Sequence, residues 1–501
     1  MVFSSNIFLF FFLPIFLVAY FLTPRKFRNY TLLLFSIVFY AYGAPDFVFL
    51  LVGECIVNYY VVRAMAKRNP EGLTDRMGGK TENGKWKTIL CAISIILSLG
   101  LLLYFKYANF MMENLNGILG WFHHEPVSWM KVALPIGISF FTFQSITYTL
   151  DVYRGVTPPS QKLTDYVLYI MMFPQLIAGP IVNYNSVAAQ LVERDSTMED
   201  RVLGFYRFVI GLAKKVLIAN TLAVYADQVF AMNYGDLSSG TAWLAALSYT
   251  MQIYFDFSGY SDMAIGLGKM MGFRFPENFN NPYTSHNITE FWKRWHITLG
   301  NFIMNYLYIP LGGNRKGKGR MYFNLWLCFL LSGLWHGASW NFVLWGAYHG
   351  LFICLDKLLN GKRNPKGLTD RMGGKTENGK FSVLRSPLSV PFTFLIVLIG
   401  WVLFRVEGIA PIGDFYQAMF SFRSGDFVRA DSQYWFVLAL ALVFSFLTLT
   451  KGGLRLQELV FADHYTPRRS WIMFAITLVL LILSAGSLCV SNFNPFIYFR
   501  F

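Results

Sequence analysis

The strongest candidate for a chemical role in this sequence is His336, in the segment 334–341. Long apolar runs at 321–334 and 342–358 flank it. An ionisable side chain at such a position in a membrane segment predicts a functional site. A low dielectric disfavours the charged imidazolium, so a buried His336 would stay neutral and keep a lone pair for a general base. The residues alone also allow a structural histidine that hydrogen-bonds a neighbouring helix.

A second histidine, His296, follows an aromatic and cationic stretch that includes Lys293 and Arg294. The chain then runs through Pro310 to a glycine pair at 312–313. Such a stretch is not a simple spanning helix, and it predicts an interfacial or re-entrant element that lines a cavity. The alternative is an interface anchor, in which the tryptophans lie in the aromatic belt and the two cations extend to lipid headgroups.

Composition predicts the elements that hold these residues. Of the 501 residues, 55% are hydrophobic and only 14% are charged, whereas soluble domains carry about a quarter charged residues. Since a spanning helix needs about 20 residues, we expect roughly 11–13 membrane segments in an all-α polytopic fold, with residues 1–501 forming one membrane domain. The apolar runs lie at 5–22, 30–43, 46–63, 88–108, 130–150, 164–182, 203–222, 241–265, 321–334, 338–358, 391–408, 434–450 and 471–490.

The first apolar run has no basic residue before it and no small-residue cleavage site after it, which favours a retained helix over a signal peptide. Arg25, Lys26 and Arg28 follow this run. The positive-inside rule therefore places the N-terminus outside the membrane. The segment 109–127 contains no Lys or Arg and fits an external loop.

Several other functions are disfavoured by the sequence. The net charge of +15 does not indicate nucleic-acid binding, because the basic residues punctuate apolar spans and form no aromatic-studded groove. The five cysteines show no CxxC spacing, so we expect neither a disulfide framework nor a zinc site. No His-Glu-x-x-His motif indicates metal catalysis. On one continuous helix, His349 would lie about 20 Å from His336 along the axis, so the two histidines could not share a site. We therefore predict that His349 is a polar residue near a helix end.

Residues 67–85 and 362–380 share 18 of 19 positions. Architectural repeats are whole structural units that diverge, so we interpret this pair as duplicated polar cytoplasmic loops. An engineered or recently copied insertion is the alternative. We assign no chemistry to either copy.

The sequence around both histidines resembles the membrane-bound O-acyltransferases, specifically their AlgI-like alginate O-acetyltransferase branch. The likeness is strongest over 104–358 and departs at 304–305, where Met-Asn replaces an expected Arg-Asp pair. The segments that carry it lie at 134–141, 173–180, 256–263, 278–283, 288–299, 306–315, 335–341 and 345–350.

The resemblance implies an acyltransferase core around a central cavity, in which His336 activates an acceptor hydroxyl against an acetyl thioester. Acetyl-CoA from the cytoplasm is the implied donor, with no resident cofactor. His296 and Asn341 are implied as further catalytic residues that orient or stabilise the reacting groups. Candidates for donor binding or cavity lining are Lys293, Arg294, Trp335 and Asp262.

The resemblance also implies a subunit in the bacterial cytoplasmic membrane that acts on an exported polysaccharide through an extracytoplasmic SGNH-type transferase. In the C-terminal segment 494–501, Tyr498 resembles a tyrosine motif that relays the acyl group, although an interfacial aromatic anchor is the alternative. Within the same fold, D-alanyl transfer to teichoic acid is an alternative function. A polysaccharide or lipid transporter and a non-catalytic scaffold are alternatives from other classes.

Overall fold

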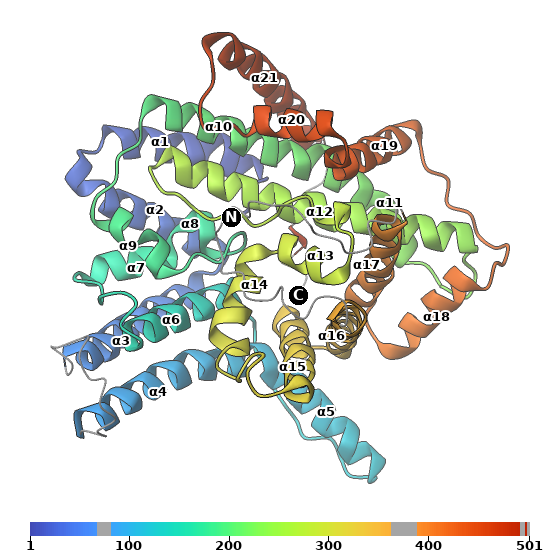
Figure 1. The fold of residues 1–501 in the computed structure, drawn as a ribbon, viewed down its shortest axis with the longest axis horizontal. Helices are drawn as coiled ribbons and strands as arrows, with labels where there is room; N and C mark the ends of the chain where they lie inside the picture. Colours follow the sequence, from blue (N-terminus) through green and yellow to red (C-terminus); the bar gives the residue numbers. More distant parts are fainter. Residues whose placement is uncertain (68–81, 362–387, 491–495, 498–501) are drawn as a thin grey trace. The chain divides into compact units, whose positions relative to one another are not determined.

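The computed structural model describes residues 1–67, 82–361, 388–490 and 496–497, and these residues form a succession of helices (Figure 1). In the described residues the only β pairing is two isolated bridges. The chain divides into two compact units. Unit 1 comprises Met1–Leu217, Asp256–Glu277 and Asp463–Phe501, and unit 2 comprises Ile218–Phe255 and Asn278–Ala462.

Two sequence predictions concern residues that lie outside this description. Of the duplicated loops, the copy at 362–380 is not described, nor is most of the copy at 67–85. Tyr498 also lies outside the described residues, whereas its neighbour Ile497 lies inside them.

Unit 1 holds the N-terminal helices, the second half of α12 and the last long helix. The bounds are η1 Phe8–Phe12, α1 Leu13–Leu22, η2 Arg25–Phe27, α2 Arg28–Gly43, η3 Pro45–Phe47, α3 Val48–Lys67, α4 Glu82–Leu102, η4 Leu103–Tyr107, α5 Ala108–Trp121, α6 Ile138–Tyr153, α7 Leu163–Met171, α8 Phe173–Leu176, α9 Tyr184–Val192, α10 Met198–Ala213, α12 Ser239–Met270 and α21 Pro467–Val490.

Unit 2 holds the first half of α12 and the helices between it and α21. The bounds are α11 Asn220–Phe230, η6 Pro282–Thr284, α13 Ile288–Arg294, α14 Ile297–Ile303, η7 Met304–Tyr308, α15 Lys318–His336, α16 Trp340–Gly361, α17 Ser389–Arg405, α18 Ile409–Phe420, α19 Ser432–Phe446, η8 Leu447–Leu449 and α20 Lys451–Val460. The π-helical segment η5, Lys214–Ala219, includes residues of both units.

Five helical segments in the described part of the chain are long and apolar enough to cross a membrane. Shorter apolar helices lie at Phe8–Leu22 and Ser389–Arg405. These findings confirm an all-α polytopic membrane protein. The five segments are Pro45–Lys67, Gly84–Trp121, Trp340–Leu359, Ser432–Leu449 and Pro467–Val490.

The apolar run 164–182 does not form one continuous helix. α7 ends at Met171, and α8 that follows is only four residues long. Pro174 lies in the first turn of α8, where its fixed φ angle is tolerated but its missing N–H prevents continuation of the preceding helix. Gly179 then adopts a φ of 100°, which favours glycine. The run is therefore a buried, broken segment.

In unit 1, α10 and α12 approach each other through two glycine pairs. A Cβ on Gly204 would lie 2.6 Å from the carbonyl oxygen of Gly266, and one on Gly211 would lie 2.5 Å from that of Gly259. On each helix the two glycines are seven residues apart, Gly204 and Gly211 on α10 and Gly259 and Gly266 on α12, so they lie on the same helix face. Small residues at such a crossing let two backbones approach closely inside a membrane protein.

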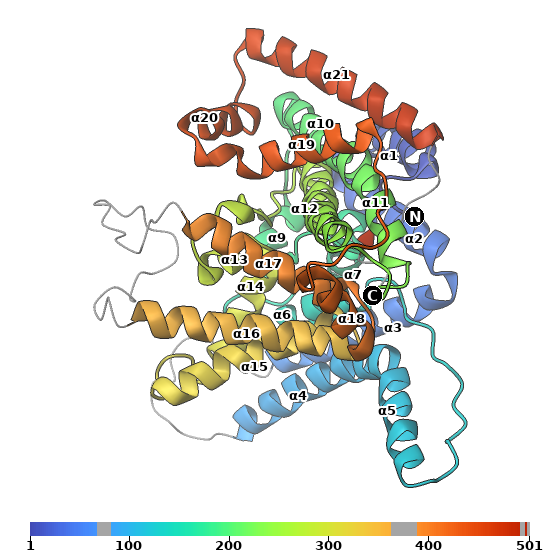
Figure 2. The same ribbon diagram turned by 90° about the vertical axis from the view of Figure 1, so that its right-hand side faces the viewer.

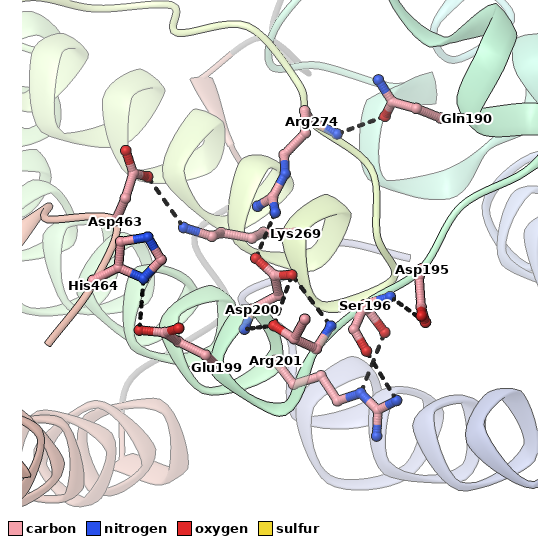
Figure 3. A network of polar contacts seen from close by, with 11 residues as sticks. Gln190, Asp195, Ser196, Glu199, Asp200, Arg201, Lys269, Arg274, Asp463 and His464 are labelled. Carbon is pink, nitrogen blue, oxygen red and sulfur yellow. Dashed lines mark hydrogen bonds and ion pairs between the residues drawn. The ribbon is translucent and has the colours of Figure 1, made fainter.

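Ion pairs and caps fix the ends of these two helices (Figure 3). α10 begins with a capping box, in which Thr197 and Asp200 each accept from the other's backbone N–H. Arg274, which follows α12, binds Asp200 at 2.6 Å. Burial raises the pKa of Asp200, but hydrogen bonds from Arg274 and Thr197 outweigh it, so the pKa lies below its usual value. Figure 3 also shows Lys269 beside Asp463.

In unit 2, α15 and α16 form an antiparallel hairpin that both ribbon views show side by side (Figure 2). Gly333 and Gly346 lie at their closest approach: a Cβ on Gly346 would lie 2.5 Å from the carbonyl oxygen of Phe329. Only residues 337–339 join the two helices. This hairpin places His336 at its turn, as the last residue of α15.

Candidate active site

His336 lies in an aromatic enclosure in unit 2, and only 6% of its surface is exposed. Its ring centroid is 4.9 Å from that of Trp335 and 5.2 Å from those of both Trp345 and Phe404. The rings of Trp345 and Phe404 meet the imidazole at 85° and 74°. These planar walls shield the imidazole from water and fix the ring, and such an environment suits proton transfer by a histidine.

His349 corrects one prediction, because it does not lie near a helix end. It lies in the middle of α16 and is fully buried. The helix break at 337–339 places the two histidines on separate helices, and both contact Trp345, with His349 at 5.1 Å between centroids. Gly400 of α17 leaves room for the imidazole, because a Cβ there would lie 2.5 Å from Nε2. Among the described residues, neither ring nitrogen of His349 has a hydrogen-bond partner.

His296 lies at the junction of two seven-residue helices, α13 and α14, neither of which is long enough to span a membrane. Its φ of 46° and ψ of 55° place it in the left-handed region, which is uncommon for a residue other than glycine. A conformation of this kind costs of order 1–3 kcal/mol and persists where the surrounding structure imposes it, often at functional sites.

Hydrogen bonds define which nitrogen of His296 carries a proton. Nδ1 lies 3.0 Å from Oδ1 of Asn278, and the hydroxyl of Thr298 donates to the same oxygen at 2.9 Å. The backbone N–H of Thr298 also points at this atom, at 3.4 Å, which identifies it as the amide oxygen. Nδ1 therefore donates, and in the neutral ring Nε2 carries the lone pair.

Burial lowers the pKa of His296 to about 3, so the imidazole is neutral at physiological pH. Its ring lies 6.1 Å from that of Trp335, which also packs against His336. The structure thus brings His296, His336 and Trp335 together from two segments of unit 2. A second aromatic contact, between Trp292 and His349 at 4.9 Å, joins α13 to the same cluster.

Of the remaining candidates in unit 2, Asn341 is buried and lies in the first turn of α16, where its amide donates to the carbonyl oxygen of Leu403 at 3.3 Å. Arg294 is partly buried and binds Glu290 at 2.6 Å. Lys293, on the same short helix, is exposed. Neither cation contacts the histidines in a described hydrogen bond or ion pair.

Asp262 belongs to unit 1, where it accepts hydrogen bonds from Arg207 at 2.9 Å and Lys214 at 2.6 Å. Arg207 also binds Glu277. These four residues form a charge-balanced network at the glycine-lined crossing of α10 and α12. Among the described residues, no group of three or more His, Cys, Asp or Glu side chains has the arrangement of a metal site.

The fold and the site together define a polytopic helical membrane protein with a buried histidine centre. Residues 156–369 match the family model described as the membrane-bound O-acyltransferase family. Over the whole length of both proteins, the chain is 42% identical to a probable alginate O-acetylase AlgI of Pseudomonas putida. The chain belongs to the membrane-bound O-acyltransferase family, in its AlgI-like branch, and is an O-acyltransferase.

Two further relatives show the breadth of this family. The chain is 35% identical to a peptidoglycan O-acetyltransferase of Helicobacter pylori, over 82% of this chain and 78% of that protein. It is 28% identical to a teichoic acid D-alanyltransferase of Bacillus subtilis, over 46% of this chain and 60% of that protein. The family resemblance and the enzyme class predicted from the sequence are confirmed, whereas the roles of individual residues stay predictions.

Sequence reasoning missed two features of the molecule. His349 carried a signal, since it follows Trp345 in a segment of the family likeness, but helix geometry alone argued against a shared site. The second feature is a buried ion pair between Lys215 and Asp256. Asp256 opens the matching segment 256–263, yet nothing local in the sequence indicates its partner.

Proposed function

We propose that this protein is a membrane O-acetyltransferase that moves acetyl from a cytoplasmic thioester, acetyl-CoA, toward hydroxyls of an exported polysaccharide. The observation that carries the proposal is the pair of buried histidines against Trp335, in a chain whose relatives are named alginate O-acetylases and peptidoglycan O-acetyltransferase. We place it in the bacterial cytoplasmic membrane with the N-terminus outside. An extracytoplasmic SGNH-type transferase is the proposed partner.

In this proposal His336 takes the proton of the acceptor hydroxyl as the oxygen attacks the thioester carbonyl. A carbon–oxygen bond forms, the carbon–sulfur bond breaks, and the proton passes from the imidazolium to the departing thiolate. The aromatic walls of Trp345 and Phe404 keep water from competing as acceptor. His296 accepts a hydrogen bond from a reacting hydroxyl through Nε2, because its Nδ1 donates to Asn278.

The other candidates take supporting roles. Asn341 ties the start of α16 to α17 through Leu403 and so fixes the turn that carries His336. Trp335 forms the wall shared by the two histidines. Lys293 and Arg294 bind the anionic part of the donor, and Asp262 organises the cations of unit 1. The acetyl group first passes to the phenol of Tyr498, and the partner transferase then moves it to the polysaccharide.

The test uses cells that lack the gene and carry wild type, His336→Ala or His464→Ala at matched membrane levels. His464 is a suitable control because its side chain is 85% exposed in a contact with Glu199. We expect polysaccharide O-acetyl content at background with His336→Ala and at the wild-type level with His464→Ala. Full acetylation with His336→Ala would contradict the proposed base.

A second measurement separates acetyl transfer from the D-alanyl alternative. Membranes that contain the protein are supplied with radiolabelled acetyl-CoA or with a D-alanyl thioester, and label on protein and polysaccharide is counted. We expect label from acetyl-CoA only, and its loss in His336→Ala. Label from the D-alanyl donor alone would favour the teichoic-acid reaction.

A further inference from the structure

A buried carboxyl group lies within the membrane-crossing helices of unit 1. Glu54, on α3, belongs to the apolar segment Pro45–Lys67, and only 5% of its surface is exposed. Two other buried acids of this unit, Asp256 and Asp262, each pair with a cation. Among the described residues, no ion pair includes Glu54. An isolated carboxylate is very costly in an apolar interior, so such a group binds a proton or a cation.

Glu54 belongs to a polar seam where α3, α4 and α6 pack side by side (Figure 1). Ser98 of α4 donates to Oε1 of Glu54 at 2.8 Å, and the hydroxyl of Ser145 on α6 lies 3.5 Å from Oε2. Each helix contributes two polar side chains four residues apart, which therefore share a helix face. The pairs are Glu54 and Asn58, Ser94 and Ser98, and Ser145 and Thr149, and all six residues are buried.

The other members of the seam connect these pairs. The amide of Asn58 donates to the hydroxyl of Tyr166 on α7 at 2.8 Å, and Tyr166 donates to Ser145 at 3.4 Å. Ser94 donates to the amide oxygen of Asn58 and lies 2.7 Å from the hydroxyl of Thr149. These hydrogen bonds orient the hydroxyls that meet the carboxyl group.

Both described partners of the carboxyl group are hydroxyls, which can donate or accept. A protonated acid can therefore donate to one hydroxyl and accept from the other. A hard cation takes about six or more oxygen ligands, whereas the carboxyl and its two hydroxyl partners supply four oxygens. The composition of the seam favours a proton over a cation.

The titratable groups around Glu54 add no charge of their own. They are the phenol of Tyr166 and the thiol of Cys55, with the phenol of Tyr40 on α2 beside that thiol. Phenols and thiols are ordinarily neutral at pH 7. Arg63, Lys106 and Asp165, charged side chains on α3, η4 and α7, form hydrogen bonds with Tyr59, Ser139 and Asn29 respectively.

We propose that Glu54 is a proton-binding site, at which a neutral carboxylic acid holds α3, α4 and α6 together. The acid donates from Oε2 to Ser145 and accepts from Ser98 at Oε1. Deprotonation transfers the proton to a base in the solvent and leaves a carboxylate without a cation between the three helices. Alkaline pH therefore weakens their contact. The site lies entirely in unit 1 and is independent of the acyl-transfer step proposed above.

Infrared spectroscopy of the purified full-length protein tests the protonation state directly. Wild type and Glu54→Gln are compared at pH 7, in sodium chloride and in choline chloride. We expect Glu54→Gln to lose the carbonyl band of a protonated carboxylic acid, equally in both salts. Glu113→Gln is the matched control, because Glu113 is 66% exposed and its substitution should remove a carboxylate band. Loss of a carboxylate band in Glu54→Gln overturns the proposal, and a sodium-dependent band would identify a cation site instead.

Thermal unfolding in detergent tests the effect on the fold. A glutamate in the unfolded chain is ionised above about pH 5. If the folded protein keeps a proton that the unfolded chain has released, the stability that Glu54 contributes is present in acid and is lost as the pH rises. We expect the melting temperature of wild type to fall relative to that of Glu54→Gln between about pH 5 and pH 9. A constant difference, or one that changes in the opposite direction, overturns the proposal.

Discussion

Two regions of this molecule bury polar groups in opposite ways. In unit 2, the histidines at 296, 336 and 349 lie among tryptophans, with His296 neutral and its lone pair on Nε2. In unit 1, the crossing of α10 and α12 buries carboxylates, each beside at least one cation. A neutral imidazole can still take up and release a proton, whereas a carboxylate that binds a neighbouring cation is fixed in place by its ion pair. The histidine region is therefore suited to catalysis, and the ion pairs are suited to holding helices in position.

The largest expected effect comes from removing an imidazole of the aromatic region. His296→Ala is expected to lower acetyl transfer by about 1,000-fold, or about 4 kcal/mol, the upper end of the range for loss of one preorganised hydrogen bond to a reacting group. Asn278→Ala is expected to lower the rate less, because it leaves the His296 imidazole in place and removes only the side chain that orients it. Initial rates with radiolabelled acetyl-CoA in membranes measure both. Equal rates for His296→Ala and wild type would show that this ring is structural.

Substitutions in the ion pairs of unit 1 should lower the stability of the protein instead of its catalytic rate. Asp262→Ala leaves Arg207 and Lys214 without their buried carboxylate and is expected to destabilise the protein by about 3 kcal/mol. Thermal unfolding in detergent measures the loss. If Asp262→Ala keeps the wild-type melting temperature but raises the KM for the acetyl donor, Asp262 takes part in donor binding. The contrast between a catalytic region and a structural region would then be wrong.

A smaller effect is expected where the aromatic region has no spare room. Gly400→Ala would place a methyl group against Nε2 of His349, and overpacking of this kind costs about 1–3 kcal/mol. Gly413, on α18, has open space around its Cβ position and serves as the matched control. The melting temperature of Gly400→Ala should be lower than that of Gly413→Ala. The same melting temperature in both variants would show that His349 can move away from the added methyl group.

The smallest expected effect is the pH response of Asp200. Its pKa in the folded protein is lower than the ordinary 3.8, so its ion pair stabilises the fold above about pH 4 and is lost as the pH falls through the folded value. Because Arg274 is 56% exposed, the contribution is under about 1 kcal/mol. The free energies of unfolding of wild type and Asp200→Asn, measured between pH 3 and 7, should become equal at the acid end of this range. A difference that grows toward low pH would contradict the prediction.

The prediction for His349 was wrong because it assumed one continuous helix. On such a helix a spacing of 13 residues would keep His336 and His349 out of the same site. That geometry does not apply here because Gly337 and the two residues after it interrupt the helix, so His336 and His349 reach Trp345 from different helices. The run 164–182 differs for a similar reason: its apolarity predicted a span, but Pro174 and Gly179 break it.

Apolar length and motif spacing are local properties of the chain, so they were enough to predict the membrane character, the helical class, the family and the candidacy of His296 and His336. Which side chains meet became known from the tertiary structure. It assigned the proton of His296 to Nδ1 through Asn278, paired His349 with Trp345, and brought Ile497 to Asp256 across 241 positions. Such contacts depend on the packing of distant helices, which no local pattern specifies.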